Sequence, residues 1–267
     1  MRTALTIAGS DSGAGAGIQA DLKTFAAHGV YGTSVITAVT AQNTVGVTMF
    51  EALSPELVRA QLDAVMSDIG AHAAKTGMLA TVPIVETVAA AVAELRIPRL
   101  VVDPVMIAKS GDRLLDDAAM QAMKGVLLPR AFVVTPNIPE AEALSGVRIT
   151  TDEHRREAAR RILSLGAAAV VIKGGHLGSP DIVDLLAVDG EFAEFRHERI
   201  AGRHTHGTGC TFAASLTASL ALGRTLAEAI PLAQRYIAGA IRQAPDIGSG
   251  HGPMNHFWER PREDGGN

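Results

Sequence analysis

The sequence contains a single cysteine, Cys210, among its 267 residues. One thiol cannot form an intramolecular disulfide, and it cannot supply a cysteine-based structural zinc site. Neither a disulfide nor a cysteine-based zinc site is therefore expected to stabilise the fold. With 47% hydrophobic residues, the chain has enough apolar material for the core of one large α/β domain, or at most two small ones.

An excess of positive charge is also lacking. Lysine and arginine number 24 against 28 aspartate and glutamate residues, which gives a net charge of −4. This balance argues against a surface that coats nucleic acid and against a polybasic membrane patch. Small molecules are therefore the expected partners.

Long apolar runs are missing as well. No segment approaches the roughly 18 uninterrupted apolar residues of a membrane helix. The apolar stretch at residues 4–8 is too short for the core of a signal peptide, so we expect a cytoplasmic protein. Neither an internal repeat nor a low-complexity linker interrupts the chain. Residues 1–258 are expected to form one domain, and the polar residues 259–267 a flexible tail.

The sequence does contain a regular alternation of short apolar runs and longer helical patterns. Strands are predicted at residues 4–8, 34–39, 73–76, 100–102, 132–135 and 170–173, and helices at 17–28, 55–69, 82–95, 116–127, 140–144, 151–165, 208–222 and 226–243. The alternation predicts a three-layer α/β/α sandwich with a mostly parallel central sheet. Segments 44–53 and 182–200, the second with an Asp189-Gly190 turn, predict antiparallel hairpins at an edge or a flap.

Ligands of such sheets bind at the carboxyl ends of the strands. The loop after the first strand, residues 9–17, is rich in glycine, but its glycines do not follow the dinucleotide-binding register. It is not a Walker A loop either, because none of the five lysines follows a glycine. The loop either simply joins strand to helix or closes over a small ligand. Asp21, in the first turn of that helix, could have no role other than to stabilise the helix dipole.

Polar side chains also follow the other strands. Gln42 offers the donors and acceptor that match an aminopyrimidine edge, although it could instead only close a turn. Asp103 and Glu140 end two neighbouring strands, where paired carboxylates suit Mg²⁺, although each could simply cap local structure. Lys173 ends a buried strand before two glycines, and we expect it to reach an anion.

The strongest motif is residues 205–212, which lead directly into a helix of small residues. Backbone amides at such a helix N-terminus form an anion site suited to phosphoryl transfer. Cys210 lies in this positive field, which predicts a thiol pKa lowered toward neutrality and a group able to accept a substrate's hydroxyl proton. The alternatives are an inert buried cysteine and a metal cluster of His204, His206 and Cys210.

These motifs, together with 75–79, 103–106, 108–112, 135–140 and 173–176, resemble the hydroxymethylpyrimidine/phosphomethylpyrimidine kinases, members of the ribokinase-like superfamily. The resemblance implies ATP-dependent phosphorylation of 4-amino-5-hydroxymethyl-2-methylpyrimidine and then of its monophosphate, in thiamine biosynthesis. It also implies a homodimer formed through segment 44–53 and a lid at 108–112. The implied pyrimidine-binding residues are Gln42, Asp21, Gly9, Ala16, Met78 and Val105. The implied reaction-site residues are Asp103 and Glu140 for Mg²⁺, Asn137, Lys173 and Thr208 for ATP, Gly207, Thr208 and Gly209 for the anion hole, and Cys210 beside the attacking hydroxyl.

Two positions depart from the family pattern. Ala14 stands where many relatives have glycine, and Arg203 stands where a smaller polar residue is expected. The sugar kinases of the superfamily have aspartate in place of Cys210, which favours the pyrimidine and pyridoxal branch. The alternatives to the pyrimidine kinase are a pyridoxal or pyridoxine kinase, a non-catalytic pyrimidine-binding regulator and, more distantly, a Rossmann oxidoreductase.

Overall fold

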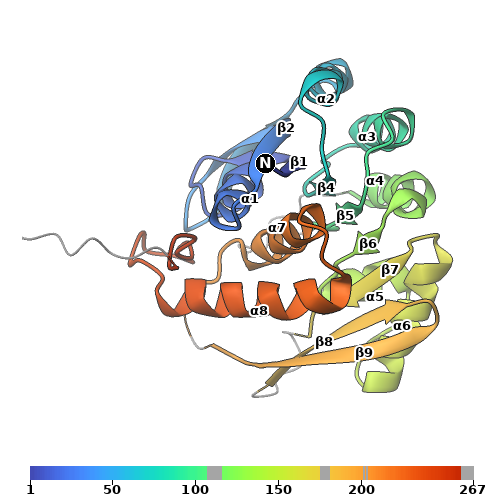
Figure 1. Cartoon of the computed structure of the whole chain (residues 1–267), viewed down its shortest axis with the longest axis vertical. Coiled ribbons are helices and arrows are strands. Elements are labelled where there is room, and N and C mark those ends of the chain that lie inside the picture. The colour runs from blue at the N-terminus through green and yellow to red at the C-terminus, as the bar shows by residue number, and fades with distance from the viewer. Residues whose placement is uncertain (107–115, 175–180, 201, 203, 260–267) are drawn as a thin grey trace, which may run out of the picture.

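In a computed structural model of the chain, described here for residues 1–106, 116–174, 181–200, 202 and 204–259, nine strands form one sheet (Figure 1). The strand order is β3-β2-β1-β4-β5-β6-β7-β8-β9. The parallel strands are β1 (Thr3–Asp11), β2 (Tyr31–Gln42), β4 (Ala73–Thr76), β5 (Leu100–Val102), β6 (Val133–Val134) and β7 (Ala169–Ile172). At the two edges, β3 (Val47–Ala52), β8 (Asp181–Val188) and β9 (Glu191–Glu198) pair antiparallel with their neighbours.

Helices cover both faces of this sheet because successive strand residues point to opposite sides. Leu5 and Ile7 pack into one core with α2 (Pro55–Asp68), α3 (Val82–Glu94), α4 (Asp117–Ala122), α5 (Ile138–Ser145) and α6 (Asp152–Ser164). Ala4 and Val101 pack into the other with α1 (Gly17–Ala27), α7 (Thr208–Ala221) and α8 (Leu226–Arg242). The predicted three-layer α/β/α sandwich with its edge hairpin is confirmed.

Helix α7 lies at the centre of its layer. Every residue from Thr211 to Ala221 is buried, and most of these side chains are small. Small side chains allow close packing, and α7 contacts β1, β4 and β5 as well as α1 and α8. The N-terminus of α7 is thereby fixed at the middle of the sheet, close to the carboxyl ends of the parallel strands.

The helices differ in how they begin. Ser54, Thr151 and Thr225 cap α2, α6 and α8, each accepting a hydrogen bond from a first-turn backbone amide. The N-cap residues of α1 and α7 are Ala16 and Gly207, which have no polar side chain to bond the first-turn amides. The first amides of these two helices therefore need another acceptor.

The predicted elements agree with the structure to within a few residues, with one difference. The segment 116–127 was expected to be one α-helix, but α4 ends at Ala122 and Met123–Leu127 forms a π-helical turn. Gly125 is a poor helix former, and Pro129 has no amide hydrogen to continue the ladder, so both weaken regular α-helical bonding here. Among the described helices, none combines the length and apolarity needed to cross a membrane.

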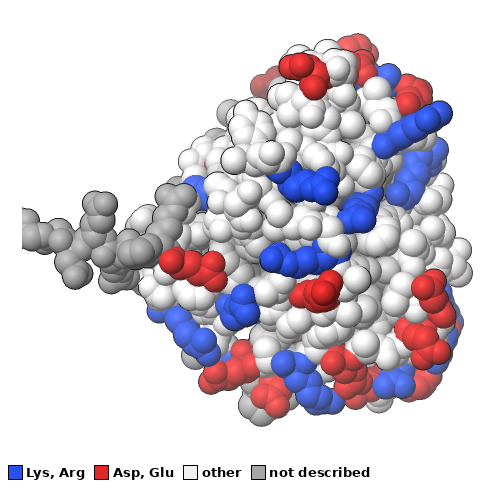
Figure 2. Space-filling view, viewed as in Figure 1, with Lys and Arg blue, Asp and Glu red and all other residues white. Residues whose placement is uncertain are grey.

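Charged side chains of both signs are mixed on the surface. On the face seen in Figure 2, blue and red side chains lie interspersed, especially along the side formed by α6, β8 and β9. Several of them are paired, as in Arg161 with Glu157 and Arg156 with Glu194. From the middle to the upper right of the same view, several blue side chains lie near one another with white surface between them.

Candidate active site

A cavity of about 780 Å³ lies at the carboxyl ends of the parallel strands. The residues that follow β1, β2, β4, β5, β6 and β7 all contribute to its wall, as expected for an open parallel sheet. All but one of the predicted site residues line it: Gly9, Ala16, Gln42, Met78, Asp103, Val105, Asn137, Glu140, Lys173, Gly207, Thr208, Gly209 and Cys210. The sheet therefore brings together side chains that are far apart in the sequence.

Asp21 is the exception. It is fully buried behind the cavity wall, where it accepts hydrogen bonds from the Lys75 ammonium at 2.9 Å and the Thr6 hydroxyl at 2.6 Å. The expectation that Asp21 itself contacts a ligand is not met by this placement. The sequence motif could not show that the ammonium of Lys75, on β4, donates hydrogen bonds to the Asp21 carboxylate.

The N-termini of α1 and α7 meet at the cavity. The left-handed Gly207, with φ +80°, precedes α7, and the first-turn residues Thr208, Gly209 and Cys210 line the cavity. The Thr208 amide donates to the Thr205 carbonyl at 3.4 Å. The N-terminal residues of α1, Ala16 and Gly17, line the same space. Side chains of other segments accept from the first amides of α1, Asp11 from Ala16 and Cys210 from Gly17. The two helix N-termini place the positive ends of two helix dipoles at one cavity, which is an anion-binding arrangement.

Cys210 lies between these two helix ends, and the backbone amide of Gly17 donates to its sulfur. Burial raises the pKa of the Cys210 thiol to about 12, although Lys75 and the Gly17 amide act in the opposite direction. The expectation of a pKa lowered toward neutrality is therefore wrong, because the loss of solvation and the nearby Asp103 and Asp21 carboxylates outweigh the Lys75 charge and the Gly17 hydrogen bond. At neutral pH the side chain is a thiol and not a thiolate.

Asp103 and Glu140 lie on the same part of the cavity wall as Lys173. The Lys173 ammonium is 3.2 Å from Asp103 Oδ1, while Asp103 Oδ2 is buried and has no hydrogen-bond partner among the described residues. Burial raises the pKa of Glu140 to about 7, and the neighbouring Asp103 carboxylate adds to the effect. Such an unpaired carboxylate oxygen beside a second carboxylate is suited to a divalent cation.

Asn137 has a structural role beside its predicted one. Its side-chain oxygen accepts from the Glu140 amide, and the Glu140 carboxylate accepts from the Asn137 amide, which completes a capping box at the start of α5. This cap fixes Glu140 at the strand end. The Asn137 carboxamide NH₂ remains to face the cavity that the residue lines.

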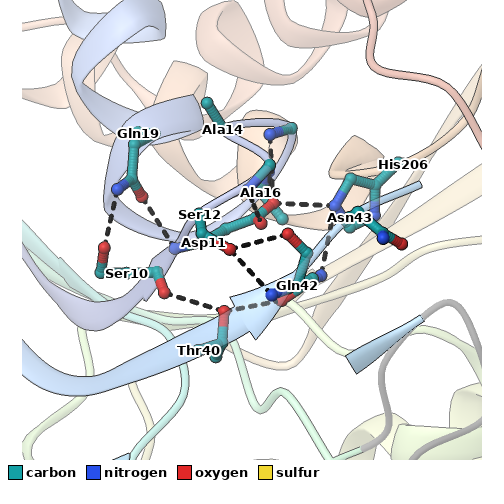
Figure 3. A network of polar contacts seen from close by, with 12 residues as sticks. Ser10, Asp11, Ser12, Ala14, Ala16, Gln19, Thr40, Gln42, Asn43 and His206 are labelled. Atoms are coloured by element: carbon teal, nitrogen blue, oxygen red, sulfur yellow. Dashed lines mark hydrogen bonds and ion pairs between the residues drawn. The ribbon is translucent and has the colours of Figure 1, made fainter. Parts of the chain in front are cut away.

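Asp11 and His206 form a contact that sequence reasoning did not identify. Asp11 accepts from the amides of Gly13, Gly15 and Ala16, and its Oδ2 lies 2.9 Å from His206 Nε2. Figure 3 shows Asp11 between Ala16 and His206. Burial alone would raise the pKa of Asp11, but the hydrogen bonds from His206 and the Ala16 amide hold it below its usual value. The one signal in the sequence was an Asp followed by small residues, typical of a carboxylate that bonds nearby amides.

Gln42 lies beside this contact. Its amide oxygen accepts from the Thr40 hydroxyl, and its amide nitrogen lies 3.3 Å from His206 Nε2 (Figure 3). Since His206 Nε2 carries a proton and donates it in a hydrogen bond to ionised Asp11, this nitrogen cannot also accept a hydrogen bond from Gln42. The amide donors of Gln42 therefore remain available to a ligand in the cavity. The predicted role also uses the amide oxygen, which keeps one lone pair beside its bond from Thr40.

Sequence reasoning also missed an apolar part of the cavity. Ile182 of β8, Ile200 after β9, and Ile237, Ala238 and Ile241 of α8 line it. They lie on the β8 and β9 side of the sheet, whereas Gln42 and Met78 follow strands on the other side. Only an amphipathic pattern marks these residues in the sequence, and core residues show the same pattern.

Some earlier expectations concern residues that the structure does not describe. They are the lid at 108–112, Arg203, and residues 260–267 of the tail. The metal cluster of His204, His206 and Cys210 receives no support, because the described residues contain no group of three such side chains placed to hold a metal ion. His206 is instead engaged by Asp11.

These features define a class: α/β proteins that bind an anionic ligand at the carboxyl edge of a parallel sheet, between helix N-termini. The sequence profile of the phosphomethylpyrimidine kinase family matches residues 11–255. The chain belongs to this family, so the predicted resemblance is confirmed.

Individual proteins agree with this assignment. The hydroxymethylpyrimidine/phosphomethylpyrimidine kinase of Bacillus subtilis is 49% identical over 255 residues, which cover 95% of this chain and 94% of that protein. The thiamine biosynthesis bifunctional protein ThiED of Geobacter sulfurreducens is 53% identical over 95% of this chain, and the chain spans only 52% of its length. A crystal structure of Bacillus subtilis pyridoxal kinase in complex with ADP, 41% identical, superposes with a TM-score of 0.89 over 96% of this chain and 98% of that one.

Proposed function

We infer that this chain is an ATP-dependent kinase of 4-amino-5-hydroxymethyl-2-methylpyrimidine and of its monophosphate, acting in thiamine biosynthesis. One observation carries the proposal: the uncapped N-termini of α1 and α7 meet at Cys210, between a polar pocket that contains Gln42 and the carboxyl ends of the strands that place Asp103 and Lys173. This is where a hydroxyl and a phosphoryl group would have to meet. The family membership and the names of the relatives support the same activity.

The pyrimidine would occupy the part of the cavity that Gly9, Ala16, Gln42, Met78 and Val105 line. Gln42 holds free amide donors there, which suit a ring nitrogen, while Met78 and Val105 offer apolar surface to the flat ring. A side chain at Gly9 would approach the Met78 sulfur to 3.3 Å, so glycine keeps this part of the pocket open. Asp21 would act from behind the wall through Lys75.

The phosphates of ATP would lie between Lys173, Asn137 and the turn at Gly207, Thr208 and Gly209. Backbone amides there would stabilise the charge on the transferring group, and Lys173 would neutralise charge on the ATP side. Burial would lower the pKa of Lys173, but the Asp103 and Glu140 carboxylates raise it, so the ammonium keeps its charge. Ile182, Ile237 and Ile241 offer an apolar surface for the adenine ring.

Asp103 and Glu140 would hold Mg²⁺, which when bound supplies positive charge to the phosphate oxygens. The unpartnered Asp103 Oδ2 is the acceptor that supports this assignment. Within the chain, Lys173 already offsets part of the charge of Asp103. Burial holds the pKa of the Glu140 carboxyl near neutrality.

Cys210 would contact the hydroxyl that attacks. As a thiol it orients this hydroxyl and does not act as a strong base. Phosphoryl transfer through a loose transition state does not demand one, because little charge develops on the attacking oxygen before the bond to the leaving group has weakened. The contribution of the site is thus mainly positioning and anion stabilisation.

A pyridoxal kinase is the second candidate. The close superposition on Bacillus subtilis pyridoxal kinase favours it, because the same backbone accommodates that enzyme's site. Both substrates carry a hydroxymethyl group on a six-membered aromatic ring, so the cavity must discriminate by ring polarity. A site that hydrogen-bonds polar ring groups rejects a ring lacking them by several powers of ten in kcat/KM.

We also propose that two copies of the chain associate through the β2 and β3 edge. Val45 is 67%, Met49 69% and Phe50 43% exposed, an unusual apolar content for an edge hairpin. Sedimentation of the full chain should give twice its monomer mass. A Met49→Lys, Phe50→Lys variant should sediment as a monomer, and an unchanged mass in that variant would refute this surface.

Product analysis tests the proposed activity. With ATP, Mg²⁺ and the hydroxymethylpyrimidine, mass spectrometry should detect the monophosphate first and then the diphosphate, with one ADP released per transfer. A protein that binds the pyrimidine tightly but releases no ADP above background would be a non-catalytic binder, and the proposed function would be rejected.

A further inference from the structure

The side chain of Asp11 connects two segments that lie on opposite sides of the anion site. Its Oδ1 accepts from the Gly13 amide at 2.8 Å, and its Oδ2 from the Gly15 and Ala16 amides at 3.1 and 2.8 Å. The same Oδ2 lies 2.9 Å from His206 Nε2 (Figure 3). One buried carboxylate thus holds both the loop before α1 and the residue that precedes Gly207.

The donor and acceptor roles of Asp11 and His206 are fixed at this contact. Asp11 is only 3% and His206 8% exposed, so water does not replace their mutual bond. Asp11 is ionised and can only accept, and His206 Nε2 must therefore donate. A charge-assisted hydrogen bond of this kind is shorter and stronger than one between neutral groups.

Close steric contact also fixes the position of the loop before α1 relative to the turn before α7. The imidazole of His206 lies against Gly15, where a Cβ would meet His206 Cδ2 at 2.3 Å. A Cβ on Gly207 would meet the Gly15 carbonyl oxygen at 1.9 Å. The backbone at 15 and at 207 can therefore approach this closely only when both residues are glycine and His206 keeps its orientation.

We propose that His206 is a positioning residue which, through Asp11, fixes the glycine-rich loop at residues 11–16 to the anion-binding turn at 207–209. The inference rests on the proposed kinase function. His206 lines the cavity beside Gln42, and the proposal gives it a role through Asp11, not through contact with the transferring phosphoryl group or the hydroxyl. It sets the distance between the pyrimidine pocket, which Ala16 and Gln42 line, and the amides that would receive the phosphoryl charge.

Kinetics of His206→Leu test the proposal, with His206→Gln as the conservative variant and His28→Leu as a matched control. The glutamine amide can still donate to Asp11, whereas leucine fills the space without a donor. His28 is a partly buried histidine bonded to Ser215 of α7, and it does not line the cavity. His206→Leu should raise the KM for the pyrimidine about 10-fold and lower kcat about 10-fold, the size of a lost charged hydrogen bond.

His206→Gln should restore both constants to within about 3-fold, and His28→Leu should change neither by more than that. A variant that merely folds poorly would lose active enzyme and therefore apparent kcat, but it would keep the KM of the remaining molecules. A His206→Leu enzyme with an unchanged KM for the pyrimidine would overturn the proposal.

Amide hydrogen exchange provides a test that needs no catalysis. His206→Leu should speed exchange in peptides covering both 9–17 and 205–212, because the amides bonded to Asp11 and the turn before α7 lose their common support. His206→Gln and His28→Leu should leave both peptides protected. Faster exchange confined to the 205–212 peptide would overturn the proposed coupling. If the wild-type chain fails to phosphorylate the pyrimidine, the proposed function is wrong and this exchange result still decides the role of His206.

Discussion

Gly207 and Gly15 touch through their backbones: a Cβ on Gly207 would lie 1.9 Å from the carbonyl oxygen of Gly15. Gly207 also has a φ of +80°, in the left-handed region. The start of α7 and the loop before α1 can form one anion site only because neither residue has a side chain at this contact.

Replacing Gly207 by alanine should therefore damage both stability and activity. The left-handed backbone and the clash with Gly15 together should lower the free energy of unfolding by roughly 2–4 kcal/mol. Gly223, at the other end of α7, is the matched control, because its φ is +90° and nothing lies within 4 Å of its would-be Cβ. Gly223→Ala should cost only about 1 kcal/mol. Equal losses in urea unfolding would contradict the close contact at Gly207.

The Cys210 thiol should not titrate in the working range of the enzyme. Because burial raises its pKa to about 12, the pH profile of kcat/KM between pH 6 and 9 should contain no step from this group. Cys210→Ala should lower kcat about 10-fold through lost positioning, and Cys210→Ser should stay within about 3-fold. A step in this range that disappears in Cys210→Ser, with a loss above about 100-fold in Cys210→Ala, would identify a thiolate base instead.

Glu140 should make the protein less stable as the pH rises. Burial raises its folded pKa to about 7 from an ordinary 4.5, so between these values the folded chain holds a proton that the unfolded chain has lost. The free energy of unfolding should fall across this window and level off above it. Glu140→Gln should therefore melt several degrees higher than wild type at pH 8 and nearly equally at pH 4.5.

The same Glu140→Gln variant should need more Mg²⁺ for half-maximal activity, since one carboxylate ligand is replaced by an amide. The amide oxygen can still accept from Asn137, so the cap of α5 is kept. A variant with lower stability than wild type at pH 8, or with an unchanged Mg²⁺ requirement, would contradict these assignments.

The buried pair of Lys75 and Asp21 should be costly to break on one side. Both side chains are fully buried, and replacing Lys75 by methionine leaves the Asp21 carboxylate without its partner. We expect a loss of about 3–5 kcal/mol in urea unfolding, and a substantial recovery in the double variant Lys75→Met, Asp21→Leu. Arg59→Ala, which removes solvent-screened ion pairs with Asp63 and Glu94, should reduce stability far less. A Lys75→Met loss no larger than this control would contradict the account.

Much of this architecture could be read from local patterns. Val101 and Val102 are apolar on both faces, which indicates a strand covered on both sides, and the parallel sheet then places Asp103 and Lys173 at one edge. The burial of individual side chains could not be predicted from the sequence. It determines the thiol pKa of Cys210 and hides Asp21 behind the cavity wall.

Contacts between side chains far apart in the sequence could not be predicted either. Asp11 and His206 are 195 positions apart, and no local pattern in either segment indicates their contact. The motif around His206 suggested backbone amides and a possible metal ligand, but not a carboxylate partner. Such partners follow from tertiary packing alone, here from the way α7 lies against α1.

The central claim is that this cavity transfers phosphoryl groups to a hydroxymethylpyrimidine. The most direct test is the ratio of kcat/KM for 4-amino-5-hydroxymethyl-2-methylpyrimidine to that for pyridoxal, measured with ATP and Mg²⁺ on the full-length chain. The donor and acceptor of the Gln42 amide match the ring nitrogen and the adjacent amino group of the pyrimidine, a pair that pyridoxal lacks, and predict a ratio above about 100 in favour of the pyrimidine. A ratio below one would assign the site to pyridoxal, and no turnover of either ring would contradict a kinase altogether.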